Sequence, residues 1–242
     1  MTTPIIRPIA VRLALAALAL GIYTIALAYY WTGNTAHEWL GLAFAVFLLI
    51  HVGIHRRWFA RAVFAWQTPR QMTDIALTAM IALICISLLT SSVLISETLL
   101  GWLGLGRHIV ARQIHAAAGW WLLISIGAHL GFRWPVIAGA IGFTRVIRQS
   151  ARLVRFVLGA VMLALAVQGI RSAQTLGVLG KLFLQPSPEW WDFEQAGTAF
   201  LLHAIAVIGL FVLLSHQLAK RLTPRASRPL RPSASADGQP AR

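Results

Sequence analysis

The chain has few charged residues for its length. Of its 242 residues, 12% are charged and 58% are hydrophobic, and the mean hydropathy is +0.71. A water-soluble domain is about 25% charged, so this chain has too little polar surface to cover a soluble globule. The composition excludes a soluble enzyme, and its hydrophobic content excludes a disordered chain. It favours a bundle of membrane helices.

Cysteine is almost absent as well, with one residue, Cys85, inside an apolar run. A disulfide framework, a Cys-x-x-Cys metal site and a Cys-x-x-Cys-His motif for covalent haem attachment are therefore excluded. Any haem has to be held non-covalently. The chain also lacks a Gly-x-Gly-x-x-Gly motif, so it contains no recognisable nicotinamide- or flavin-binding segment of that type.

Six apolar runs are each about 18 to 23 residues long, which is enough to cross the hydrocarbon core of a membrane as a helix. The first run is too long for the core of a signal peptide, and it ends in Tyr29, Tyr30 and Trp31 rather than in small residues. Asp74 is expected to be the N-cap of the third helix. The predicted fold is an all-α polytopic membrane protein with six transmembrane helices, at residues 13–31, 36–55, 75–95, 114–132, 153–170 and 196–218.

The 21 basic residues are distributed unevenly over the predicted loops. The amino terminus, the second and fourth loops and the carboxy-terminal tail hold 17 of them, and the opposite side holds 4. Lys and Arg concentrate in cytoplasmic loops, so both termini are expected in the cytoplasm, beneath a bacterial-type plasma membrane. Topology thus accounts for the basic excess, and nucleic acid is not expected as a partner. The tail, residues 223–242, is expected to be disordered and to contact membrane lipid.

Four of the eight histidines form two matched pairs. His37 and His51 lie in the second predicted span, His115 and His129 lie in the fourth, and each pair is 14 residues apart. At about 100° per residue, 14 residues come within about 40° of four full turns, so each helix presents both imidazoles on one face, about 21 Å apart. Both spans run from outside to inside, which places His37 level with His115 and His51 level with His129.

Histidines that face each other across a helix bundle are typical ligands of haem iron. The sequence therefore predicts two stacked haem b groups, the outer one held by His37 and His115 and the inner one by His51 and His129. The alternative is that these are isolated polar residues hydrogen-bonded within the bundle, although ionisable residues inside a membrane are expensive and functional by default. Zinc fits less well, because each level offers only two nitrogens.

An internal repeat supports the two-haem interpretation. A shift of 78 residues superimposes two histidines and two glycines of the second span on those of the fourth: His37 on His115, Gly41 on Gly119, His51 on His129 and Gly53 on Gly131. The glycines leave room for a broad macrocycle or for a neighbouring helix. The predicted organisation is a four-helix haem-binding bundle at residues 1–135, a C-terminal two-helix membrane segment at 136–222 and the basic tail at 223–242.

Four further residues are weaker candidates for the haem sites. His55 lies one turn beyond His51 and is a possible replacement as inner ligand, but its counterpart in the second repeat is Arg133, so His51 is preferred. Arg112 and Arg133 are positioned to pair with haem propionates, although loop topology alone also accounts for both. His203, in the sixth span, is expected to pack in the core or to line a quinone site.

The segments that contain the four histidines, together with residues 190–194 and 209–214, resemble the flavinylation-associated cytochrome family. The resemblance covers nearly the whole chain except the tail, although paired histidines occur more widely in the di-haem membrane cytochromes of respiratory dehydrogenases. It implies that electrons pass from membrane quinol to a flavin-carrying domain outside the cytoplasm. This chain has no flavin-attachment domain, so the extracytoplasmic flavin- or haem-carrying redox partner is expected to be a separate protein.

Two other functions stay open at this point. A transmembrane metal reductase would use the same haems but would receive electrons from a separate cytoplasmic source. A haem-free membrane scaffold or transporter subunit would use none. The favoured function is an electron-transfer subunit, with the quinone pool as its donor and an extracytoplasmic protein as its acceptor.

Overall fold

The protein is an all-α membrane protein, as the composition predicts. The computed structural model describes residues 6–62, 64, 67–105, 108–149, 151–185 and 191–223, and these contain helices and loops without a strand. Six helices are long and apolar enough to cross a membrane. They are α1 (Ile6–Leu27), α2 (Tyr29–Ala62), α3 (Pro69–Ile95), α4 (Ile109–Ala140), α6 (Arg152–Thr175) and α8 (Phe193–Arg221). The prediction of six spans is therefore confirmed. Tyr29, Tyr30 and Trp31, which were expected at the end of the first span, instead begin α2. The predicted tail lies outside the described residues from position 224 onwards.

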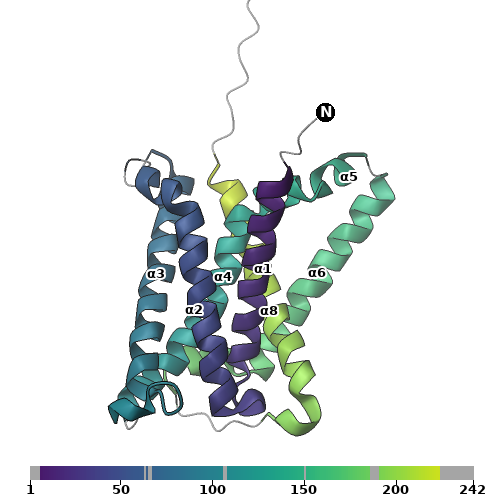
Figure 1. Ribbon diagram of the computed structural model, residues 1–242. Helices are drawn as coiled ribbons and strands as arrows, with labels where there is room; N and C mark the ends of the chain where they lie inside the picture. The colour runs from purple at the N-terminus through teal and green to yellow at the C-terminus, as the bar shows by residue number, and fades with distance from the viewer. Residues whose placement is uncertain are drawn as a thin grey trace, which may run out of the picture.

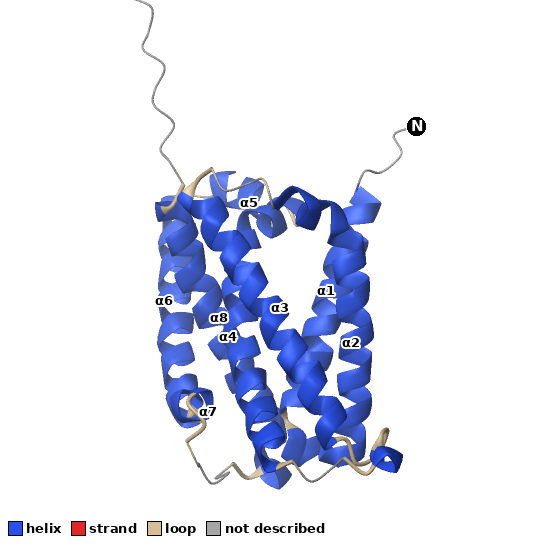
Figure 2. Cartoon of the chain, turned by 90° about the vertical axis from the view of Figure 1, so that its left-hand side faces the viewer, coloured by secondary structure: helices blue, strands red, loops and turns tan. Residues whose placement is uncertain are grey.

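The long helices run alternately up and down the bundle (Figures 1 and 2). Helices α2, α4 and α8 run in one direction, and α1, α3 and α6 run in the other, so the first and last described residues lie at the same end. We call this the inner end and the opposite one the outer end. A short helix, α5 (Phe143–Gln149), lies at the inner end, and η1 (Gly101–Leu103) and α7 (Val178–Leu182) lie at the outer end.

Helix α4 is central, because it packs against both α3 and α8. Close approach between α4 and α8 depends on two glycines of α4 that are one turn apart. A Cβ at Gly127 would lie 2.8 Å from the Ile208 carbonyl oxygen, and a Cβ at Gly131 would collide with Ser215 Oγ and the Val212 carbonyl. Small residues spaced in this way let two membrane helices bring their backbones together. The repeated glycine at position 131 therefore accommodates a neighbouring helix.

The two repeat-related glycines, Gly131 and Gly53, offer a matched comparison. No atom lies within 4 Å of a Cβ built at Gly53. We expect Gly131→Ala to destabilise the fold by about 1–3 kcal/mol through overpacking against α8. Gly53→Ala should be neutral or stabilising by up to about 1 kcal/mol, because alanine is the better helix former. Thermal unfolding in detergent, followed by circular dichroism, measures both changes. Equal melting temperatures for the two variants would contradict the packing described here.

Helix α3 begins earlier than the sequence predicted. Its N-cap is Thr68, whose hydroxyl accepts from Gln71 N at 3.2 Å, while the Gln71 side chain accepts from Thr68 N at 3.1 Å. This reciprocal capping box satisfies backbone donors at the start of the helix, and Pro69 follows at a position where its missing N–H is not needed. The prediction that Asp74 is the N-cap is therefore wrong. Asp74 lies within the helix and forms an ion pair with Arg133 at 2.9 Å.

Helix α2 stands apart from α3 and α4 along its outer half. It follows α1 after a single residue, and its first turn is interrupted at Gly33, where φ is 74° and ψ is 167°. Such a positive φ suits glycine, which has no Cβ to clash with the following backbone. The main packing partner of α2 is α1, with a smaller contact to α8. This arrangement leaves space between α2 on one side and α3 and α4 on the other.

Candidate functional site

A cavity of about 840 Å³ occupies this space in the outer half of the bundle. Side chains from α1, α2, α3, α4, α7 and α8 line it, and most of the lining is apolar. Its volume lies within the range of about 300–1,000 Å³ that is usual for small-molecule and cofactor sites. The polar groups that reach it include His37 from α2 and His115 from α4.

The structure brings His37 and His115 together across the cavity. Their ring centroids are 5.8 Å apart, and the ring planes are inclined by 74°. Two imidazoles that bind one metal ion from opposite sides would have centroids about 6 Å apart, because each metal–nitrogen bond is about 2 Å long and each ring centroid lies about 1 Å beyond its nitrogen. The separation therefore fits the predicted outer pair of ligands.

The hydrogen bonds of both rings identify which nitrogen is free to bind a metal. His37 Nδ1 lies 2.8 Å from the Ala26 carbonyl oxygen, which only accepts, so Nδ1 carries the proton. His115 Nδ1 lies 3.2 Å from Ser91 Oγ and 3.4 Å from Ser92 Oγ. Each of these hydroxyls already donates to a carbonyl of its own helix, so each accepts from His115. In the neutral rings Nε2 is therefore unprotonated, as a haem ligand requires.

Glycines one turn after each histidine line the same cavity. No atom lies within 4 Å of a Cβ built at Gly41, and the nearest atom at Gly119 is Leu27 Cδ1 at 3.6 Å. No packed neighbour requires glycine at Gly41, in contrast to Gly131. Both positions keep the surface beside the histidines flat, which fits a planar macrocycle between α2 and α4. Tyr23 fixes the α4 backbone here by donating its hydroxyl to the Gly119 carbonyl at 2.6 Å.

Two basic side chains lie at the outer mouth of the cavity. Arg112 forms an ion pair with Glu97, and Lys181 of α7 lies 4.6 Å above the Trp120 ring. Arg112 thus lines the cavity and is paired with Glu97, and its pairing with a haem propionate stays a prediction. Lys181 was not predicted, because its place in the cavity depends on how α7 folds back against α4.

Three histidines lie towards the inner end of α2 and α4: His51, His55 and His129. The rings of His51 and His55 lie against each other with centroids 4.6 Å apart, and both are within electrostatic range of His129. His129 Nδ1 is buried and has no hydrogen-bond partner among the described residues. Ligation through Nε2, as assigned for the outer pair, would leave this Nδ1 unpaired, so the atom gives no support to an inner ligand. The predicted pairing of His51 with His129 stays a prediction.

The remaining candidates have partners within the protein. Arg133 lies 2.9 Å from Asp74 and 5.0 Å from the centroid of the Trp58 ring, so it ties α4 to α3 and α2. His203 Nδ1 lies 2.8 Å from Ser172 Oγ on α6, and its ring packs edge-on against Trp191. His203 therefore joins α8 to α6. This contact fits a packing role, and His203 is not among the residues that line the cavity.

Four residues at the site were missed at the level of sequence: Glu38, Ser91, Ser92 and, as described above, Lys181. Serines inside an apolar helix are common, and nothing in their spacing identifies a histidine 23 or 24 residues later as their partner. Among the described residues, no group of three or more His, Cys, Asp or Glu side chains is placed to hold a metal ion. Comparison of the chain with protein-family models, curated proteins and solved structures gives no match.

Proposed function

We propose that the chain is an integral-membrane b-type cytochrome with two haems that carries electrons across the membrane. The donor is the quinone pool, and the acceptor is a separate flavin- or haem-carrying protein on the extracytoplasmic side. The observation that carries this proposal is the outer histidine pair, with its 5.8 Å ring separation inside a large apolar cavity. The proposal places both termini in the cytoplasm, in accordance with the charge distribution.

The residues of the outer site fit this role. His37 and His115 supply two unprotonated Nε2 atoms, while Ala26, Ser91 and Ser92 hold the protonated Nδ1 atoms. Such partners fix the orientation of a ligand ring and raise its basicity. A haem held by His37 and His115 would supply one-electron redox chemistry. The apolar lining would limit the access of water and would hold such a group without a covalent bond.

The inner site rests on the internal repeat, which pairs His51 with His129. These two histidines would hold a second haem, about 21 Å along the helix axes from the outer pair. Such a haem would supply a second one-electron carrier between the outer pair and the inner end of the bundle.

An absorption spectrum of the purified protein tests the proposal directly. We expect a low-spin b-type spectrum after reduction, two haems per chain, and complete extraction of the haem by acid acetone, because Cys85 alone cannot attach it covalently. Reduction by a quinol analogue is expected as well, which distinguishes this function from a metal reductase fed from the cytoplasm. A colourless protein from haem-replete cells would favour a scaffold or transporter subunit and would overturn the proposal.

A further inference from the structure

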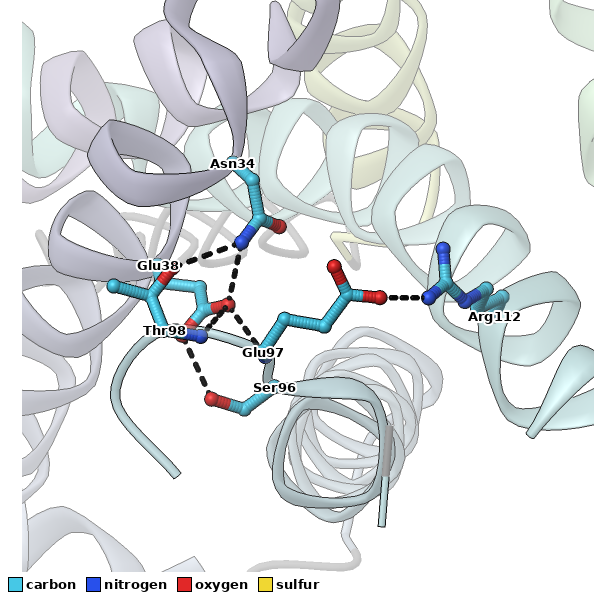
Figure 3. Close-up of polar contacts among 6 residues, drawn as sticks. All are labelled: Asn34, Glu38, Ser96, Glu97, Thr98 and Arg112. Carbon is cyan, nitrogen blue, oxygen red and sulfur yellow. Dashed lines mark hydrogen bonds and ion pairs between the residues drawn. The ribbon is translucent and has the colours of Figure 1, made fainter. Parts of the chain in front are cut away.

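The carboxylate of Glu38, the residue after His37, accepts hydrogen bonds from five donors, all of which except Leu99 are drawn in Figure 3. Oε1 accepts from the Asn34 side chain at 2.9 Å and from two backbone N–H groups at 2.8 and 3.0 Å. Oε2 accepts from a serine hydroxyl at 2.7 Å and from two backbone N–H groups at 2.8 and 3.2 Å. The donors outside α2 belong to the segment that follows α3: Ser96 Oγ and the backbone nitrogens of Glu97, Thr98 and Leu99.

Three successive backbone N–H groups converge on this one carboxylate. Such an arrangement is an anion-binding concavity, and here its anion is a side chain of the protein itself. Hydrogen bonds to an ionised acceptor are roughly twice as strong as those between neutral groups. The Asn34 amide also donates to Thr98 Oγ1 at 2.9 Å, which adds a further link between the same two segments.

This contact bridges the two walls of the cavity. Helix α2 carries His37 and packs mainly against α1, whereas α3 carries Ser91 and Ser92, which hold His115. The cavity separates these walls along the outer half of the bundle, and Glu38 joins them at its outer edge. The distance between the two histidine rings therefore depends on a contact in which neither ring takes part.

We infer that Glu38 is a positioning residue that holds His37 opposite His115 by fastening the start of α2 to the end of α3. This role rests on the proposed haem function and adds a residue that does not touch the ligand. Glutamine at position 38 is not expected to replace glutamate in this role. Both carboxylate oxygens accept from backbone N–H groups, so either orientation of an amide would place its NH₂ against an N–H donor.

The test compares Glu38→Gln with Glu194→Gln, a matched loss of charge at an exposed position in the first turn of α8. Loss of a residue that orients a metal ligand typically lowers affinity about 10- to 100-fold. We expect a loss of this size for the outer haem in Glu38→Gln, measured by haem titration, with the inner haem and the Glu194→Gln protein unaffected.

A second measurement does not depend on haem. Spin labels at the exposed positions Trp39→Cys and Ile86→Cys, in a Cys85→Ala background, report the distance between α2 and α3 by pulsed electron double resonance. We expect Glu38→Gln to broaden the distance distribution in the haem-free full-length protein and Glu194→Gln to leave it unchanged. An unchanged distribution in Glu38→Gln overturns the inference, whether or not haem is lost, and so does normal affinity for the outer haem. If the wild-type chain binds no haem, the proposed function fails, and the label distances alone decide whether Glu38 positions α2.

Discussion

Replacing His115 with alanine is expected to remove the outer haem and to leave the inner one in place. His115 supplies one of two unprotonated Nε2 atoms in the cavity, and its Nδ1 is already held by Ser91 and Ser92. His37→Ala should remove the same haem, so haem content should fall from two per chain to about one in either variant. The double variant should lose no more than each single one, because residues that share one site are non-additive. Haem content and the reduced spectrum of the purified proteins measure this.

His203→Ala is the matched control for these variants. His203 also lies in a membrane helix and also hydrogen-bonds a serine, but its contacts are to Ser172 and Trp191 between α6 and α8. It should therefore retain both haems even if the fold is less stable. Independent, additive losses from His37→Ala and His115→Ala would show that the two rings do not share a ligand.

The fold and the outer pair could be predicted because both depend on periodicity. Hydropathy alone locates the six helices, and alternation of direction makes α2 and α4 parallel. The 14-residue spacings then place His37 and His115 at matching depths, and the structure has them 5.8 Å apart. These inferences need only the rise and twist of a helix, which are the same in every sequence.

Contacts between distant segments could not be predicted in this way. In the sequence, Glu38 is simply one of the few acidic residues near the end of a predicted transmembrane helix. Its partners are mainly backbone N–H groups, and such groups leave no recognisable pattern in a sequence. Asp74 was expected as a cap because it precedes an apolar run, but Thr68 and Gln71 start the helix two turns earlier. Gly131 matches Gly53 in the repeat, yet only Gly131 contacts another helix, because α8 has no counterpart beside α2 at that point.

Helix geometry alone also leaves the inner ligand on α2 undecided. From His37, 14 residues to His51 fall about 40° short of whole turns, whereas 18 residues to His55 complete about five turns. His55 therefore lies on the same face as His37 but about 6 Å deeper than His51. The two ring centroids lie 4.6 Å apart with the planes inclined by 39°, and both rings interact electrostatically with His129.

Alanine substitution at His51 and at His55 decides which of the two histidines is the inner ligand on α2. Only one of the two variants is expected to lose the inner haem. We expect His51→Ala to remove the inner haem, because the repeat aligns His51 with His129. The same repeat aligns His55 with Arg133, and arginine is not a haem ligand. His55→Ala should retain both haems, His129→Ala should match His51→Ala, and His51→Ala combined with His115→Ala should empty both sites. Electron transfer from quinol to an outside acceptor should fail in each ligand variant, because in the proposed function two haems would conduct in series. The reverse result, with haem lost in His55→Ala and kept in His51→Ala, would assign the inner site to His55.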